Sequence, residues 1–353
     1  MTHSDSILGS LLGEALGDSV GLWCEGMTPR RQSLCGPYRQ RFLFGKGMCS
    51  DDTEHALMTA QALIGSAGES DRFVRSLAWR LRGWLLGVPA GIGVATLRAI
   101  FKLWLGFPPS RSGVWSAGNG PAMRAGILGV AFGHDPQRLR ELVRCSTRLT
   151  HTDPKAEAGA FAVAIAAHVA ATTDASAELP TRFRSLLSAH LDEHAAELLV
   201  LIDRAIHSAG ACEDTDAFAR TLGLERGVTG YMYHTVPVVL QSWLRHPRDF
   251  RVAINAVVCC GGDTDTTAAI LGSIVGAGVG KEGLPADWLA NLWEWPCGVV
   301  WIERVAARLA ETLARQQPLQ PVPTNVPLLL LRNVLFAGIV LTHGFRRLLP
   351  PYG

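Results

Sequence analysis

Hydrophobic positions recur at helical spacing along most of the chain. Apolar residues return every three or four positions in Ile7–Ser19, Asp51–Gly65 and Pro154–Thr172, which is the spacing of one helix face. The same pattern predicts further helices over residues 121–130, 181–207, 248–259 and 266–276. Gly and Pro fall between these segments, as at Gly36-Pro37, and no strong strand-like alternation is present. The pattern predicts an all-α chain.

The composition changes near residue 318. Four prolines there predict an extended arm, and the strongly apolar run Leu328–Leu341 follows them. Arg332 and Asn333 interrupt this run, which is shorter than the ~20 residues that a bilayer requires. We therefore expect one helical domain over 1–317 and, over 318–353, a proline-rich arm with an apolar helix that packs on the body or on a partner. The prolines are Pro318, Pro321, Pro323 and Pro327.

The bulk composition excludes several classes of protein. Of 353 residues, 48% are hydrophobic and 18% are charged, so the chain can bury a sizeable core. The net charge of +2 predicts no affinity for nucleic acid or for acidic membranes. The first residues lack the basic region of a secretory signal, and no CxxC pair occurs, so we expect reduced thiols and a cytoplasmic protein. The cysteines are Cys24, Cys35, Cys49, Cys145, Cys212, Cys259, Cys260 and Cys297.

Two acidic clusters stand directly ahead of predicted helices, in distant parts of the chain. They are Ser50–Thr53, with the sequence SDDT, and Gly261–Thr266, with the sequence GGDTDT. Carboxylates and hydroxyls are the hard oxygen ligands that Mg²⁺, Mn²⁺ and Ca²⁺ prefer. The same residue types also cap helix N-termini, but a cap needs only one of them, and adjacent like charges cost free energy unless a cation offsets them. We predict that the two clusters meet and hold divalent cations.

A long stretch of the chain carries no acidic residue. Between Asp71 and Asp135 only basic charges occur, together with the Gly-rich turns Gly91–Gly93 and Gly118–Gly120. A Gly-rich turn ahead of a helix can hold phosphate oxygens, so this stretch predicts a basic wall beside the acidic site, although a solvated basic face is the alternative. The basic residues are Arg72, Arg75, Arg80, Arg82, Arg98, Lys102, Arg111 and Arg124.

Three single residues are of interest because of their neighbours. His151 precedes a long Ala-rich helix and is either structural or part of a pocket. His55 follows the first acidic cluster by one turn, and we interpret it as a neighbour of the site rather than as a ligand. Glu25 falls in a predicted loop after the first helix, where a carboxylate could serve as a general base or as a gate.

Five sequence blocks, taken in their order along the chain, resemble the motifs of the ADP-ribosylglycohydrolase family. The resemblance extends from Leu8 to about Gly276, and the last of its five blocks is the most specific. The C-terminal arm falls outside it. The blocks are Gly13–Asp18 with Glu25, Ser50–Thr53, Gly118–Arg124, Thr150-His151 and Gly261–Thr266.

The resemblance implies a fold and a set of site residues. The family has an orthogonal all-α helical bundle with a site for two Mg²⁺ ions, replaced by Mn²⁺ in some members. Glu25 would gate the site and help to protonate the leaving group, and Asp52 or Asp265 would accept a proton from water. The turn Gly118-Asn119-Gly120 would hold the diphosphate and the distal ribose, and His151 would line the pocket. By motif, the metal ligands would be Ser50, Asp51, Asp52, Asp263, Asp265 and Thr266.

Two positions depart from the family pattern. Ser50 replaces a common Thr and keeps its hydroxyl, whereas Pro121 replaces a small polar residue or Gly beside the expected phosphate contact.

The implied activity is the removal of ADP-ribose from a modified target. We favour a protein target with an arginine linkage, although an ADP-ribose-containing small molecule also fits, and nucleic acid would enter only as a modified substrate. Two alternatives stay open at this point. The chain could act mainly as a binding protein that occludes an ADP-ribosylating toxin, as an immunity partner does. It could also be a two-metal phosphoesterase, which would release AMP or phosphate instead of ADP-ribose.

Overall fold

The computed structural model describes residues 1–32, 38–42, 44–174, 176–191 and 193–347. Helices supply the regular structure of these ranges, and the extended segments there pair only as isolated bridges. The predicted all-α class is therefore confirmed. Cys35 and the turn Gly36-Pro37 fall outside the described residues.

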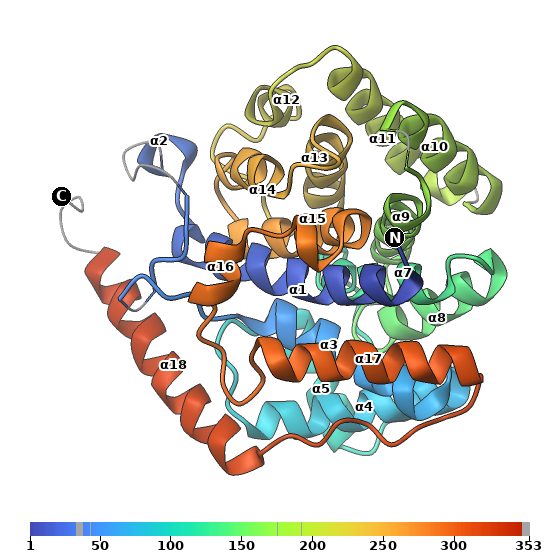
Figure 1. Ribbon diagram of the computed structural model, residues 1–353, viewed down its shortest axis with the longest axis vertical. Helices are drawn as coiled ribbons and strands as arrows, with labels where there is room; N and C mark the ends of the chain where they lie inside the picture. Colours follow the sequence, from blue (N-terminus) through green and yellow to red (C-terminus); the bar gives the residue numbers. More distant parts are fainter. Residues whose placement is uncertain (33–37, 43, 175, 192, 348–353) are drawn as a thin grey trace.

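The helices are arranged in layers around a central pair (Figure 1). Their bounds are α1 His3–Gly21, α2 Pro29–Gln32, α3 Asp51–Ser66, α4 Ser70–Leu86, α5 Val94–Trp104, α6 Pro109–Ser112, α7 Gly126–Phe132, α8 Pro136–Arg148, α9 Pro154–Thr172, α10 Leu179–His190, α11 Ala196–Gly210, α12 Thr215–Thr221, α13 Met232–Arg245, α14 Phe250–Val258, α15 Thr264–Val279, α16 Ala286–Asn291, α17 Val299–Arg315 and α18 Val326–Arg347.

The central pair is formed by α1 and α15, which run antiparallel and touch along their backbones. A Cβ added at Gly13 would overlap the carbonyl oxygen of Gly272, and one added at Gly17 would overlap that of Ala268. Gly9 and Gly21 face α15 in the same way. Because the helices are antiparallel, the C-terminal end of α1 lies beside the N-terminal end of α15. The first helix thus reaches the second acidic cluster.

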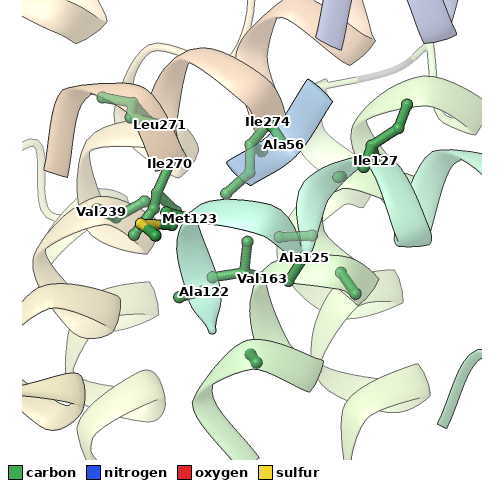
Figure 2. Close-up of a cluster of buried hydrophobic side chains, with 14 of the residues drawn as sticks. Ala56, Ala122, Met123, Ala125, Ile127, Val163, Val239, Ile270, Leu271 and Ile274 are labelled. Carbon is green, nitrogen blue, oxygen red and sulfur yellow. The ribbon is translucent and has the colours of Figure 1, made fainter. Parts of the chain in front are cut away.

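The hydrophobic core surrounds this pair. Figure 2 shows Ile270 of α15 beside Met123 and beside Val239 of α13, and Ile274 beside Ala56 of α3. These side chains are at most 4% exposed. Burial of a side chain of this kind contributes roughly 1.5–3 kcal/mol, so the core fixes α15 firmly.

Two predicted helices are wrong as continuous elements. Residues 181–207 form α10 and α11, separated at Leu191 by an extended backbone, because α10 packs on α9 whereas α11 packs mainly on α13. Residues 121–130 form a 3₁₀ turn, Ala122–Arg124, followed by α7.

The 3₁₀ turn has a physical reason in Arg124. Its guanidinium is fully buried and donates hydrogen bonds to Ser146 Oγ (3.0 Å), Ser146 O (2.9 Å) and Thr150 Oγ1 (2.7 Å). A buried charged group needs such partners, and the turn directs the side chain toward them.

The C-terminal arm runs along the body before it forms α18 (Figure 1). Gln61 of α3 holds the arm by two hydrogen bonds to the backbone of Val322, at 2.7 and 2.9 Å. In α18, the buried Arg332 forms ion pairs with Glu294 (2.7 Å) and with Glu54 (3.3 Å). Its Nη2 also donates to the carbonyl oxygen of Cys49.

The residues Val326–Phe345 of α18 are long and apolar enough to cross a membrane by length and composition. The ion pairs of Arg332 to the body favour a helix docked on the protein surface, because a charged side chain within a bilayer is costly.

We expect Gly13→Ala to destabilise the protein by about 1–3 kcal/mol or more, because the added methyl group forces α1 away from α15. Gly83→Ala is the matched control, since nothing lies within 4 Å of its Cβ and Ala favours the helix by up to about 1 kcal/mol. Urea unfolding followed by circular dichroism measures both variants. Equal midpoints for the two would contradict the close approach of the helices.

Candidate active site

The first acidic cluster begins α3, but its two aspartates are not needed as caps. Ser50 caps the helix, because its Oγ accepts a hydrogen bond from the backbone N–H of Asp52. Asp18 of α1 accepts further bonds from the backbone N–H groups of Ser50 (2.9 Å) and Thr53 (3.2 Å). The Thr53 hydroxyl donates to the same carboxylate at 2.5 Å. The carboxylates of Asp51 and Asp52 are left for another purpose.

The second cluster begins α15, and again its carboxylates do not cap the helix. Asp263 occupies the N-cap position without a side-chain capping bond. Its Oδ2 instead accepts a hydrogen bond from Asn119 Nδ2 at 2.7 Å. The Thr264 hydroxyl donates to the carbonyl oxygen of Gly21 at 2.8 Å, which fastens this end of α15 to α1. The capping alternative therefore explains Ser50 but not the aspartates.

A tight backbone arrangement holds the Glu25 loop against the second cluster. Gly26 N donates to Gly262 O at 2.7 Å, and Gly262 N donates to Met27 O at 2.8 Å. Gly262 has φ +82°, and a Cβ there would overlap the backbone of Val228. Glycine is thus required at this position, and it brings the loops around residues 25 and 228 together.

The two clusters meet, as the sequence predicts. The Thr266 hydroxyl donates to Asp52 Oδ2 at 3.2 Å, and the Ser50 hydroxyl donates to the same oxygen at 3.0 Å. Asp52 is 1% exposed and Asp265 is 5% exposed. One oxygen of each, Asp52 Oδ1 and Asp265 Oδ1, is buried without a hydrogen-bond partner among the described residues.

Burial and mutual repulsion perturb these carboxyl groups. Burial raises the pKa of Asp52, and the nearby charges of Asp51 and Asp18 raise it further. Burial likewise raises the pKa of Asp265, with additional contributions from Glu25 and Asp263. The pKa of Asp51 is raised by burial and then by Asp18 and Glu54. Burial raises the pKa of Asp18 to about 7, although its hydrogen bonds to Thr53 and Ser50 oppose the shift.

A cavity of about 530 Å³ opens onto this acidic centre. It brings together nine of the residues singled out in the sequence, whereas Ser50 and Asp52 are buried just behind its wall. The nine are Glu25, Asp51, Gly118, Asn119, Gly120, His151, Asp263, Asp265 and Thr266.

The donor set fits a hard divalent cation by its chemistry. Carboxylate and hydroxyl oxygens surround the site, and the unpartnered oxygens of Asp52 and Asp265 are available as ligands. Within the described ranges, no three His, Cys, Asp or Glu side chains form a ready-made metal cluster. Mutual repulsion keeps unpaired carboxylates apart, so a cation would have to draw them inward. The acidic residues are gathered at one cavity, but those in the described ranges do not form a complete set of ligands around one point.

The Gly118–Gly120 turn lines the same cavity and contacts the acidic centre directly. Asn119 N donates to Gly230 O at 2.9 Å, and its side chain bridges Asp263 and Thr235. A Cβ at Gly118 would lie 3.1 Å from His151 Nε2, so the turn and the imidazole are in close contact. Burial, and secondarily Arg124, lowers the pKa of His151 to about 3. This histidine is therefore a neutral hydrogen-bonding group at physiological pH.

The predicted basic wall is wrong. The acid-free stretch contributes Gly91, Gly93–Thr96 and Ser116 to the cavity, but no Arg or Lys is among the lining residues. Arg82 instead donates to Leu103 O, and Lys102 donates to Gly113 O. These cations stabilise the chain locally and cannot serve as a phosphate clamp inside the cavity.

His55 is structural, as expected. Its Nδ1 lies 3.0 Å from Arg124 Nη1, and its ring contacts Trp84 edge-on with centroids 4.6 Å apart.

Sequence reasoning assigned no role to two acids of α1. Asp18 organises the start of α3, and Glu14 is fully buried with both carboxylate oxygens unpartnered among the described residues. Burial raises the pKa of Glu14, and Asp52 and Asp18 raise it further. The signal was available, because the two acids lie four residues apart, on one face of a helix whose other residues from Ile7 to Gly21 are apolar or small.

The stability of the metal-free protein should fall as pH rises from about 4 to 7. The folded pKa of Asp18 is about 7, above its ordinary value, so the folded state holds a proton that the unfolded state has lost in this window. Urea midpoints in EDTA at pH 5 and pH 7.5 measure the slope. Asp18→Asn should flatten it, whereas Glu225→Gln, at an exposed turn, should leave it unchanged. A rise in stability over the same range would contradict the burial of these acids.

Comparisons with known proteins agree on one family. The family model described as ADP-ribosylglycohydrolase matches residues 1–319. ADP-ribosylhydrolase ARH3 of Xenopus tropicalis is 28% identical, over 84% of this chain and 93% of that protein. The ADP-ribosyl-[dinitrogen reductase] glycohydrolase of Rhodospirillum rubrum is 25% identical, over 82% and 90%. A solved structure titled ADP-ribosylglycohydrolase-related protein complex shares the fold with a TM-score of 0.64, at 24% identity over 88% of this chain and 99% of that one.

Proposed function

Because the chain belongs to the ADP-ribosylglycohydrolase family, we propose that it is a hydrolase that releases ADP-ribose from a modified target. The observation that carries this proposal is the shared cavity. Its lining includes Asp265, which keeps an unpartnered oxygen among the described residues, and the Gly118–Gly120 turn with a neutral His151. The carboxylates suit activation of water at a ribose, and the turn with His151 suits a diphosphate or a sugar hydroxyl.

We propose that two Mg²⁺ ions, or Mn²⁺ in their place, bind at the acidic side. Ions of this kind supply a Lewis acid for sugar hydroxyls and a water molecule of lowered pKa. The proposed ligands are Ser50, Asp51, Asp52, Asp263, Asp265 and Thr266.

The chain's own residues have distinct proposed roles. Asp52 and Asp265 each keep one buried oxygen without a partner among the described residues, so either can accept a proton from attacking water. Glu25 is exposed at the edge of the cavity, where it can protonate the leaving group. Cleavage of the bond at C1″ passes through an oxocarbenium-like state, which the surrounding carboxylates stabilise by their negative charge.

We favour a protein target with an arginine linkage. The printed name of the Rhodospirillum rubrum relative gives a protein, dinitrogen reductase, as what that enzyme acts on. Glu25 lies exposed at the edge of the cavity and is not among the proposed metal ligands, so its negative charge would attract a cationic guanidinium there. An uncharged serine linkage lacks this attraction.

We expect Mg²⁺-dependent release of ADP-ribose from an ADP-ribosylated arginine protein, faster than from matched serine-linked or nucleic-acid substrates. Asp263→Ala should abolish release, and Glu25→Gln should reduce kcat by about 100-fold or more if the carboxyl group protonates the leaving group. Glu225→Gln serves as the control. Chromatography of the products measures free ADP-ribose directly.

Other products would indicate a different reaction. Release of AMP or inorganic phosphate would favour the phosphoesterase alternative. Absence of release from every substrate, despite bound cation, would contradict the proposed function, and unchanged turnover in Glu25→Gln would remove Glu25 from the mechanism.

A further inference from the structure

A second cavity, of about 580 Å³, lies beneath the C-terminal helix. Its volume falls within the ~300–1,000 Å³ range of small-molecule sites. It shares no lining residue with the active-site cavity. Helix α18 supplies one wall, and this helix lies beyond the residues 1–319 that match the family model. The cavity is therefore built partly from a segment outside the range that matches the family model. Figure 1 shows this helix at the edge of the molecule, after the arm.

Apolar side chains dominate the walls. Leu57 and Met58 of α3 face Trp84 of α4, and Leu329 and Leu330 of α18 close the cavity from the side of the arm. Leu86 is 65% exposed and Leu330 is 42% exposed, so these two mark the solvent-facing rim. Such a lining favours a ligand with an aliphatic or aromatic body.

Two carboxylates reach the cavity, but the protein already pairs them. Glu294 is ion-paired with Arg332 and accepts a hydrogen bond from Cys49 N at 2.9 Å. Glu54 accepts from Trp84 Nε1 at 2.5 Å and forms an ion pair with Arg332. They have little capacity left for a cationic ligand.

Arg80 differs from these groups. Its Nε is buried and has no hydrogen-bond partner among the described residues, although the side chain lines the cavity. Arg80 forms no ion pair with the described residues, and burial lowers the pKa of its guanidinium. The side chain is partly exposed, but its buried Nε lacks an acceptor, and an anion bound beside it would supply one.

Thiol chemistry does not account for the cavity. Cys49 and Cys297 both line it, but burial raises the pKa of each thiol, to about 12 for Cys297. Both therefore stay protonated and unreactive at physiological pH.

We propose that this cavity binds a small amphipathic carboxylate, with its hydrocarbon body between α3, α4 and α18 and its carboxylate on Arg80. The carboxylate would accept hydrogen bonds from the guanidinium, and the apolar body would displace water from the Leu57, Trp84 and Leu329 surfaces. The proposed ligand contacts lie outside the acidic site, because neither Arg80 nor Leu57, Trp84 and Leu329 line the first cavity.

Decanoate, decanol and decyltrimethylammonium, each below its micelle concentration, test the proposal on the full chain. Trp84 and Trp301 line the cavity, so quenching of tryptophan fluorescence and calorimetry both report binding. Decanoate should bind about 10-fold or more tightly than either other probe, because only it offers a charge-assisted hydrogen bond to Arg80.

Two variants test separately how much the Arg80 charge and the open space of the cavity contribute to binding. Arg80→Gln should remove the preference for decanoate over decanol, whereas Arg98→Gln, the same change at an exposed residue that does not line the cavity, should leave it intact. Gly83→Leu should weaken the binding of all probes, because the space above Gly83 is open and lies in the cavity wall, and Leu suits the exposed helix.

Three results would overturn the proposal. They are the absence of decanoate binding, equal affinity for decanoate and decanol in the unaltered protein, and decanoate binding that survives in Gly83→Leu. Gly83→Leu should fold, because Leu is a better helix former than Gly. The third result can therefore be measured even if Arg80→Gln fails to fold.

Discussion

The backbone contact between α1 and α15 is the constraint on which the rest of the structure depends. Four glycines of α1 allow the two helices to touch where any side chain would overlap a carbonyl group. Because the helices run antiparallel, this contact places the end of α1 beside the start of α15, and Thr264 fastens the two at Gly21. The same helix carries Asp18, which holds the start of α3. One helix thus positions both acidic clusters, although they are about 210 residues apart in the sequence.

This arrangement costs free energy mainly because it buries several carboxyl groups close together. Asp51, Asp52 and Asp265, together with Asp18 and Glu14, have raised pKa values because of burial and, except at Asp18, also because of their mutual repulsion. Folded proteins retain such groups where they serve a function, since an apolar core would be more stable. Caps and hydrogen bonds from Ser50, Thr53 and Asn119 fix the clusters in place without consuming every oxygen. The unused oxygens are what make this a candidate active site.

Much of the fold and of the site could be predicted from local patterns. Helical spacing gave the bounds of α9 directly, and the residue types of the two acidic clusters indicated that they meet. The break between α10 and α11 depends on which neighbour each half packs against, and no local pattern records that. The prediction of a basic wall was wrong for a similar reason. A charge count along the chain does not reveal that Arg82 and Lys102 bind carbonyl groups elsewhere. Residues 228–230 reach the cavity through backbone contacts with Gly262 and Asn119, which are tertiary contacts.

We propose above all that the two acidic clusters form one divalent-cation site. Titration of the metal-free protein with Mn²⁺, followed by the loss of the free-ion electron paramagnetic resonance signal, tests it without any substrate. We predict about two bound Mn²⁺ per chain, with loss of binding in both Asp51→Asn and Asp265→Asn, one variant for each cluster. Absence of binding in the unaltered protein, or full binding that survives removal of either carboxylate, would contradict the claim.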